Sequence, residues 1–335
     1  MKYLWFSHFS GCGGSTIGAL QSNFTPQLAI ENDELIADLY QKNINSNILI
    51  KDICSIQISD IAPIVPSPNE RARNNQILVM QTSPPCQEFS QANMKRDTSS
   101  HRADILKDTI WQYALLHPEY VILENVKAYK DSKALKEFES FLLSMGYAIY
   151  KKILNSADFG VPQTRERLIL IAAKNGYPML QIIPTHAKSP SNQLSLFEQP
   201  KQQWVGWYEA INDLIPELGI VAASKAERER NIPDGALIER VGWFDAPKFR
   251  YPPDPCWTLR ASLADDGKTG RSKVIDIYHK EVVRTLNIQA LARLQSFPDW
   301  YQWGESFKIN MRGIGNSVPP LLMKHICDAV KTACE

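Results

Sequence analysis

Short apolar runs alternate with longer amphipathic segments along the first half of the chain. The apolar runs have the length and composition of buried strands, and they lie at residues 3–9, 27–30, 48–50, 77–80, 120–123, 148–154 and 167–173. The segments between them have helical spacing and lie at 15–20, 33–43, 103–116 and 133–145, the last with Gly146 as its cap. This alternation predicts an α/β fold with a mainly parallel sheet that helices cover on both faces.

The pattern changes after Ala173. Residues 185–203 are rich in Ser, Gln, Pro and Asn, which is typical of a linker or a long loop. From 204 to 280 the alternation of strands and helices is lost, and aromatic residues are mixed with Arg and Lys. Helical spacing returns from 284 to 335. We therefore expect a second, smaller domain, followed by helices that pack back on the first domain.

Composition limits the class of protein. Hydrophobic residues make up 44% of the 335 residues, so a sizeable core is expected. The formal net charge is only +1, from 37 basic and 36 acidic side chains, which argues against a histone-like binder of polyanions. A local basic cleft is still compatible with this balance, because the distribution of charge decides binding.

The cysteines and the apolar runs indicate the compartment. The six cysteines stand at positions 12, 54, 86, 256, 327 and 334, and no two of them form a C-x-x-C pair. A chain of this length does not need disulfides, so we expect a reducing cytoplasm and no structural metal. The first residues lack the apolar core of a signal peptide, and no apolar run reaches the length of a membrane helix.

The most informative segment is 82–90, which reads T-S-P-P-C-Q-E-F-S. An apolar run leads into it, and Pro84 and Pro85 end the strand and fix the backbone before Cys86. In open parallel sheets ligands bind at the carboxyl ends of the strands, which makes Cys86 a candidate nucleophile. The alternative is a small buried hydrophobe, because a reactive cysteine needs an electropositive and partly open site.

A glycine turn at 9–14, F-S-G-C-G-G, follows the first strand. It is not the dinucleotide pattern G-x-G-x-x-G, since Thr16 stands where the third glycine would be. Glu31, which ends the second strand, could accept from ribose hydroxyls, and Asp52, which ends the third, from an adenine amino group. Because the turn carries no Lys or Arg, a phosphate-free adenosine fits better than a dinucleotide. A tight turn with two ordinary strand-end carboxylates is the alternative.

Two further strand ends carry charged groups. Glu124 could hydrogen-bond a ring nitrogen of a heterocycle, although alone it reads better as a solvated acid. Strand alternation would send Arg165 and Arg167 to the same face, where two guanidinium groups suit a carbonyl oxygen, a carboxylate or a phosphate. Taken alone, the two arginines are explained better by ordinary surface ion pairs on an edge strand.

These segments, taken in order, resemble the motifs of the cytosine-C5 DNA methyltransferases, especially those of bacterial restriction-modification systems. The similarity covers nearly the whole chain. The matching segments are F-S-G-C-G-G at 9–14, P-P-C-Q-E-F-S at 84–90, E-N-V at 124–126, Q-T-R-E-R at 163–167, A-R-L-Q-S-F-P-D at 292–299 and G-N-S-V-P-P at 315–320.

The resemblance implies a Rossmann-like catalytic domain at 1–175 and 284–335, and a target-recognition domain at 176–283. It implies S-adenosyl-L-methionine as the methyl donor, with S-adenosyl-L-homocysteine as the product. The expected cofactor residues are Phe9, Gly11, Cys12, Gly13, Gly14, Glu31, Asn32, Asp52, Ile53, Pro85, Asn316 and Val318. The expected DNA-binding residues are Ser90, Gln91, Arg96, Arg167, Lys248, Arg250 and Arg271.

The resemblance also implies a mechanism. A thiolate from Cys86 would add to C6 of a cytosine flipped out of duplex DNA, which lets C5 attack the sulfonium methyl. Glu124 would hold N3 and Arg165 would pair with O2. The polar loop at 90–104 is a candidate lid over the flipped base. The residue or water that removes the C5 proton is not identified.

Two other functions fit the same motifs. One is an RNA cytosine methyltransferase that acts on a tRNA loop. The other is a DNA-binding regulator with an inactive methyltransferase fold, against which the presence of Cys86, Glu124, Arg165 and Asn316 argues. For the enzyme we expect a cytoplasmic bacterial monomer with double-stranded DNA as its partner. A cognate restriction endonuclease would act separately.

Overall fold

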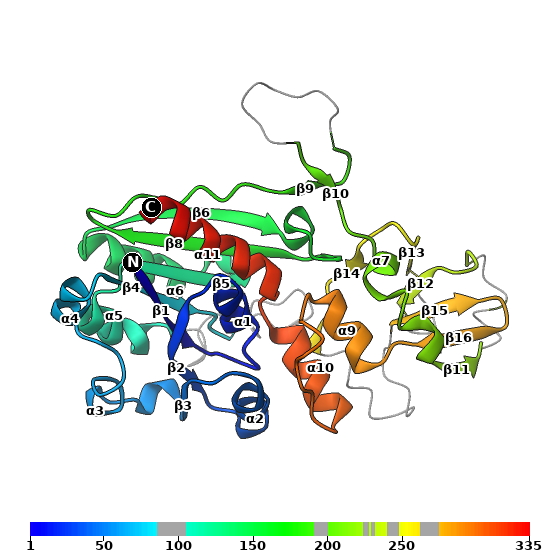
Figure 1. Ribbon diagram of the computed structural model, residues 1–335, viewed down its shortest axis with the longest axis horizontal. Helices are drawn as coiled ribbons and strands as arrows, with labels where there is room; N and C mark the ends of the chain where they lie inside the picture. The colour runs from blue at the N-terminus through cyan, green and yellow to red at the C-terminus, as the bar shows by residue number, and fades with distance from the viewer. Residues whose placement is uncertain (86–104, 191–199, 224–227, 229–231, 240–247, 262–274) are drawn as a thin grey trace. The chain divides into compact units, whose positions relative to one another are not determined.

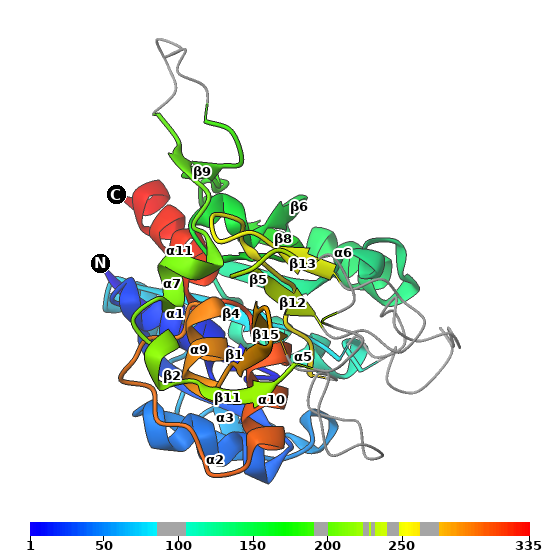
Figure 2. The ribbon, with the colours of Figure 1, turned by 90° about the vertical axis from the view of Figure 1, so that its right-hand side faces the viewer.

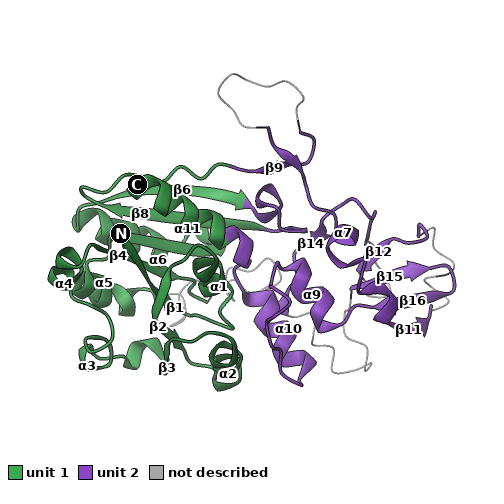
Figure 3. Ribbon diagram, viewed as in Figure 1, with its two compact units in different colours: residues 1–154, 166–183, 323–335 green, residues 155–165, 184–322 purple. Residues whose placement is uncertain are grey.

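The computed structural model describes residues 1–85, 105–190, 200–223, 228, 232–239, 248–261 and 275–335 (Figure 1). The described chain divides into two compact units (Figure 3). Unit 1 comprises Met1–Leu154, Glu166–Ile183 and Met323–Glu335, and unit 2 comprises Asn155–Arg165 and Pro184–Leu322. These units are defined by packing, whereas the predicted boundaries 1–175, 176–283 and 284–335 separate a catalytic domain from a target-recognition domain. Those boundaries stay a prediction.

Unit 1 contains a sheet that, in the described residues, has seven strands in the order β3-β2-β1-β4-β5-β8-β6. Its strands are β1 Lys2–His8, β2 Thr25–Glu31, β3 Asn47–Ile50, β4 Gln76–Thr82, β5 Tyr120–Val126, β6 Tyr147–Asn155 and β8 Glu166–Lys174. The pairs β1–β2, β2–β3, β1–β4 and β4–β5 are parallel, and β5–β8 is antiparallel. The predicted α/β fold with a mainly parallel sheet is confirmed.

The helices of unit 1 are α1 Gly14–Gln21, α2 Glu34–Asn43, α3 Ile58–Ile61, α4 Pro68–Arg73, α5 Ile110–Leu116, α6 Lys133–Ser144 and most of α11 Pro320–Cys334. Among them, α2 and α6 begin at side-chain caps that the sequence offers. Asp33 accepts from the Ile36 amide at the start of α2, and Ser132 accepts from the Leu135 amide at the start of α6. Gly146, with φ of 82°, follows the end of α6 as predicted.

The central strands of unit 1 are buried on both faces. Every residue of β1 after Lys2 is buried, and so are the residues of β4 after Gln76. Parallel strands covered on both sides have this continuous apolar pattern instead of alternation. The sheet is therefore a rigid support, and its carboxyl edge can present polar groups.

Unit 2 contains shorter elements. In its described residues a sheet of five strands has the order β11-β16-β15-β12-β13, and all four neighbouring pairs are antiparallel. Figure 2 shows β11, β12, β13 and β15 of this sheet. These strands are β11 Gly219–Ala222, β12 Leu237–Glu239, β13 Lys248–Arg250, β15 Ile275–His279 and β16 Val282–Thr285. Two small pairs, β7 Gln163–Thr164 with β14 Cys256–Trp257 and β9 His186–Ala187 with β10 Gln202–Gln203, are parallel. The helices are α7 Trp207–Ile211, α9 Ile288–Leu294 and α10 Phe307–Asn316.

Membrane insertion of a helix is not supported by the described chain. None of its helices combines the length and the hydropathy that a bilayer-spanning segment requires.

His8, the last residue of β1, should make stability depend on pH. It is fully buried beside Tyr113, whose hydroxyl lies 3.3 Å from His8 Nδ1. Burial lowers the pKa of His8 from 6.5 to about 3, although a hydrogen bond with Gln112 opposes the shift. The native imidazole stays neutral while the unfolded chain takes up a proton below pH 6.5, so this contribution is complete above pH 6.5 and is lost toward pH 3.

When the pH falls from 6.5 to 5, the free energy of unfolding of the wild type should fall by about 2 kcal/mol more than that of His8→Gln. Urea unfolding of both proteins at the two pH values measures it. Other histidines titrate in both proteins, so the difference isolates His8. Parallel pH profiles for the two proteins would contradict the assignment.

Candidate functional site

The loops after β1, β2, β3 and β4 share the carboxyl edge of the sheet in unit 1. Gln81, near the end of β4, ties two of them together. Its Oε1 accepts from Ser7 Oγ at 2.6 Å and from Ser15 Oγ at 3.0 Å, and its Nε2 donates to Ser83 Oγ at 2.7 Å. The start of the first helix and the turn before Pro84 are thus fixed to the same buried amide.

The glycine turn adopts backbone conformations that favour glycine. Gly11 and Gly13 have φ of 56° and 90°, and Phe9 has φ of 52°, which is uncommon for a bulky residue. A Cβ on Gly13 would collide with Ile44, whereas a Cβ on Gly11 would meet nothing within 4 Å. The backbone is therefore packed against the protein at Gly13 and open at Gly11, where a ligand can approach it.

Glu31 fixes this turn. Its Oε2 accepts from the Gly11 amide at 2.8 Å, and its Oε1 accepts from the amides of Asn32 and Asp33 at 3.0 Å. A carboxylate accepts about four hydrogen bonds, so three backbone donors leave room for a ribose hydroxyl. Glu31 thus acts on the glycine turn as well as being a candidate ligand residue.

The remaining predicted cofactor residues of unit 1 border the same edge. Asp52 is exposed and accepts from the Cys54 amide at 2.9 Å, while Ile53 beside it is buried. Asn32 and Pro85 are exposed, whereas Cys12, Gly13 and Gly14 are buried. Open backbone, exposed polar groups and the absence of Lys and Arg from residues 9–14 fit a phosphate-free adenosine group.

The turn that leads to Cys86 is anchored from the neighbouring strand. Asn125, buried near the end of β5, donates from Nδ2 to the Pro84 carbonyl at 3.0 Å, and its Oδ1 accepts from the Val126 amide. This contact fixes the backbone two residues before Cys86. Cys86 itself lies outside the described residues, together with the whole of the predicted lid at 90–104.

Glu124 and Arg167 form an ion pair in unit 1. The distance from Arg167 Nε to Glu124 Oε1 is 3.0 Å, and the Glu124 residue is 5% exposed. The two residues lie diagonally across the antiparallel pair β5–β8, where Arg167 is opposite Val126 and Glu124 is opposite Ile169, near the carboxyl end of β5. A carboxylate and a guanidinium are therefore held side by side, next to the strand end that positions Pro84.

Arg165 has other partners than Arg167. The prediction that strand alternation puts both arginines on one face of the same strand is wrong. β7 ends at Thr164 and β8 begins at Glu166, so the strand is interrupted at Arg165. Arg165 is 2% exposed, and its Nη atoms donate to the carbonyls of Leu259, Gly315 and Ser317 at 3.0 to 3.1 Å. The Nη atoms of Arg165 therefore serve backbone carbonyls, and its predicted contact with the base stays a prediction.

A sequence model of the family C-5 cytosine-specific DNA methylase matches residues 5–332. The chain belongs to this family. It is 27% identical to the Type II methyltransferase M1.HphI of Haemophilus parahaemolyticus, covering 98% of this chain and 87% of that protein. It is also 27% identical to the Type II methyltransferase M.AplI of Arthrospira platensis, with 98% and 85% covered. The Dnmt2 methyltransferase of S. pombe has the same fold, with a TM-score of 0.66 over 99% of both chains at 16% identity.

This chain is therefore a DNA cytosine-5 methyltransferase, and the two relatives named above are Type II methyltransferases. The predicted family, fold class and enzyme class are confirmed. Because the description of the family names a DNA methylase, it favours methylation of DNA over the two alternatives, an RNA methyltransferase and an inactive regulator.

The predicted residues of the second half lie in unit 2. Asn316 is exposed at the end of α10, and Val318 is buried two residues later. In β13, Lys248 is exposed and Arg250 lies 5.5 Å from the centre of the Trp257 ring. Ser90, Gln91, Arg96 and Arg271 lie outside the described residues. Their roles, and those of the cofactor residues, stay predictions.

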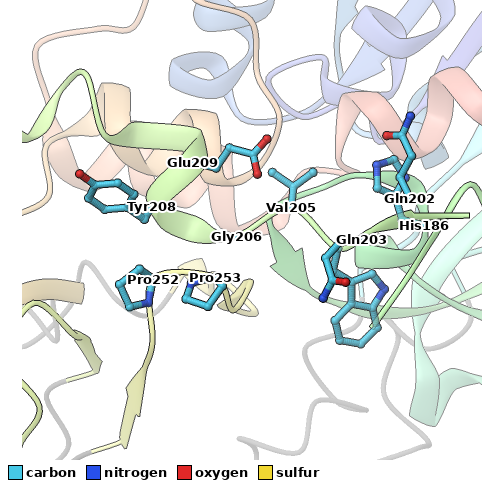
Figure 4. Close-up of a pocket in the computed structure, with 10 residues that line it drawn as sticks. His186, Gln202, Gln203, Val205, Gly206, Tyr208, Glu209, Pro252 and Pro253 are labelled. Atoms are coloured by element: carbon cyan, nitrogen blue, oxygen red, sulfur yellow. The ribbon is translucent and has the colours of Figure 1, made fainter. Parts of the chain in front are cut away.

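A cavity of about 490 Å³ is formed entirely by residues of unit 2 (Figure 4). Its walls include Trp204 and Tyr208, and Pro252 and Pro253 pack so close to Gly206 that no side chain would fit there. No Lys or Arg lines it, and burial lowers the pKa of His186, which lines one side. Among the described residues, none of the predicted cofactor or catalytic positions lines this cavity.

The sequence alone did not single out three polar side chains that hold the site. They are Gln81, Asn125 and Gln163, each buried and each bonded to more than one partner. Asn125 and Gln163 stand inside the segments E-N-V and Q-T-R-E-R, so their positions in the motifs are the signal that could have identified them. Gln81 is an amide in an otherwise apolar buried strand, which is also a recognisable anomaly.

Proposed function

We propose that this DNA methylase transfers the methyl group of S-adenosyl-L-methionine to C5 of a cytosine within a specific duplex sequence. The observation that carries the proposal is the link through Gln81. It ties the helix that follows the open glycine turn to the turn that precedes Cys86. An adenosine site and a nucleophile on adjacent strands of one sheet is the arrangement that methyl transfer to a covalently activated base requires.

The cofactor would occupy the carboxyl edge of unit 1. The backbone around the cofactor would be formed by Phe9, Gly11 and the buried Cys12, Gly13 and Gly14. Glu31 would accept hydrogen bonds from the ribose hydroxyls. The adenine would be bordered by Asn32, Asp52, Ile53 and Pro85. Asn316 and Val318 would complete the site. When bound, this cofactor supplies an electrophilic methyl group on a sulfonium sulfur.

Cys86 would supply the nucleophile for the flipped cytosine. Its thiolate would form a bond to C6 and place electron density on C5, so that C5 could take the methyl group while the methyl–sulfur bond breaks and S-adenosyl-L-homocysteine leaves. Loss of the C5 proton to a base restores the C5–C6 double bond and expels the thiolate. Extrusion of the cytosine from the stack costs a few kcal/mol, which contacts to the protein must offset.

Glu124 and Arg167 would hold the base. Glu124 can share a proton with N3, and the Arg167 guanidinium, 3.0 Å from it, can donate to O2. This proposal transfers to Arg167 the contact with O2 that the sequence assigned to Arg165, because Arg165 already donates to three carbonyls.

Replacement of Arg167 by Gln is expected to lower the rate of methyl transfer about 10²- to 10³-fold, because a charged donor to the developing oxyanion is lost. Single-turnover measurements with preformed enzyme–DNA complex report this step. Lys127→Gln is the matched control, since Lys127 pairs with exposed Glu166 on the surface and should leave the rate unchanged. Equal rates for Arg167→Gln and Lys127→Gln would exclude the role.

Duplex DNA that contains 5-fluorocytosine tests the proposed chemistry. Fluorine at C5 blocks the final elimination, so the enzyme should accumulate a covalent adduct when the methyl donor is present. Bisulfite sequencing of DNA from a host that expresses the protein would reveal the methylated sequence. Methylation of tRNA without methylation of duplex DNA would refute the proposal.

We propose further that Lys248 and Arg250 contact DNA phosphates, because an exposed lysine and a guanidinium on a sheet that also exposes aromatic rings suit a nucleic acid surface. A protective role beside a separate restriction endonuclease, and action as a monomer, complete the proposed function. The type II relatives support the protective role by their names.

A further inference from the structure

Arg165 of unit 2 binds the two carbonyl groups that flank Asn316. Its Nη2 donates to the Gly315 carbonyl at 3.1 Å and to the Ser317 carbonyl at 3.0 Å, while its Nη1 donates to the Leu259 carbonyl at 3.0 Å. The side chain is almost completely buried. All four residues belong to unit 2, so the arrangement is internal to one compact unit.

The end of α10 explains why a cation is placed here. The helix ends at Asn316, and the last carbonyls of a helix lack partners within the helix and carry partial negative charge. Gly315 and Ser317 are buried, so water does not satisfy their carbonyls, whereas Asn316 between them is exposed. The buried guanidinium therefore fixes the backbone on both sides of one outward-facing amide side chain.

A second layer holds the same turn. Gln295 Nε2 also donates to the Ser317 carbonyl, at 2.7 Å, and Gln295 Oε1 accepts from Gln163 Nε2 at 2.5 Å. Gln163 Oε1 in turn accepts from the Leu259 amide at 3.0 Å. The backbone N–H and the backbone carbonyl of Leu259 are thus both bonded to residues of the segment Q-T-R-E-R.

The packing around Gly315 leaves little freedom. A Cβ at this position would lie 2.5 Å from the Arg260 carbonyl carbon, so only glycine lets the backbone approach so closely. Arg260 also pairs with Glu239 of β12 at 2.5 Å. The turn at Asn316 is therefore pressed against a segment that is anchored to the five-stranded sheet.

From these contacts we infer that Arg165 is a positioning residue for cofactor binding: it presents Asn316 to S-adenosyl-L-methionine through the turn 315–317. The inference rests on the proposed function, in which Asn316 belongs to the cofactor site. The two arginines would then have different roles. Arg167 acts on the base that reacts, and Arg165 acts on cofactor affinity without touching either substrate.

Titration calorimetry with S-adenosyl-L-homocysteine on the full chain tests this inference without the reaction. Arg165→Lys and Arg165→Gln are expected to weaken binding at least about tenfold, since a turn released from its clamp presents Asn316 imprecisely. At saturating S-adenosyl-L-methionine their kcat should stay within about threefold of wild type, whereas their KM for the cofactor should rise. Arg167→Gln should show the opposite, with an unchanged affinity for S-adenosyl-L-homocysteine and a low kcat.

Gln295→Ala tests the same turn independently if Arg165→Gln does not fold. It removes one of two donors to the Ser317 carbonyl and should weaken binding in the same direction, by less. Unchanged affinity in Arg165→Lys and Gln295→Ala, or a loss confined to kcat at saturating cofactor, would overturn the inference. Failure of wild type itself to bind S-adenosyl-L-homocysteine would instead refute the proposed function.

Discussion

Replacement of Cys86 by Ala is expected to abolish methyl transfer, with a loss of at least about 10³-fold, on the scale of nucleophile removal in other enzymes that use covalent catalysis. Without the bond to C6, C5 of cytosine is too weak a nucleophile to attack the sulfonium methyl group. The covalent adduct with 5-fluorocytosine DNA should disappear in the same variant. Binding of S-adenosyl-L-homocysteine should persist, because the glycine turn is held by Glu31 and Gln81 and not by the thiol.

Cys54 offers a matched control. It is exposed, and its Sγ donates to Asp108 Oδ2 at 3.1 Å. Partial burial and the nearby carboxylates of Asp108 and Asp52 raise the pKa of this thiol to about 12, so it is protonated and unreactive at neutral pH. Cys54→Ala should retain both methyl transfer and the adduct. A Cys86→Ala enzyme that still forms the adduct would refute covalent catalysis by Cys86.

The strands and helices of unit 1 were predictable because each carries a strong local signal. β1 and β4 are long buried runs, Asp33 and Ser132 are caps, and Gly146 ends α6. The two short helices α3 and α4 were not predicted. The signal for α4 was present, since Ser67 and Glu70 form a capping box and Pro68 follows the cap. A helix of six residues has too few periods to stand out among polar neighbours.

The five-stranded sheet of unit 2 was not predictable in the same way. Its described strands have three to five residues, which is too short for an alternating pattern to be recognised. The aromatic and basic composition identified the region as different, but its pairing depends on contacts between strands far apart in the sequence. β12, for example, pairs with β15 across more than thirty intervening residues.

The candidate site shows the same limit for side chains. Residue types and strand ends were enough to place Glu31, Glu124 and the turn at Pro84 on one edge of the sheet. They could not show that Glu31 accepts from three backbone amides, or that Arg165 and Arg167 have different partners. Strand alternation assumes an unbroken strand, and the break at Arg165 is a tertiary feature that no local pattern carries.

Replacement of Arg71 by Met should destabilise the protein by about 3 to 5 kcal/mol, the usual cost of removing one partner of a buried ion pair. Arg71, in α4, is completely buried, and its Nε and Nη2 each lie 3.1 Å from the carboxylate of Glu119. It also donates to the carbonyls of Pro66, Leu116 and His117, two of which are at the end of α5. Met fills the space, but it leaves the carboxylate and three carbonyls without these donors.

The midpoint of urea unfolding measures the loss, and Arg73→Met is the matched control. Arg73 lies on the same helix but is exposed, so its replacement should change stability by no more than about 0.5 kcal/mol. Arg71→Met combined with Glu119→Gln should lose less than the sum of the single variants, because the second change removes the stranded charge. The Leu78 amide, which donates to Glu119 at 2.6 Å, can still donate to the Gln oxygen. Equal unfolding midpoints for Arg71→Met and Arg73→Met would show that the pair does not hold α4 and α5 to the sheet.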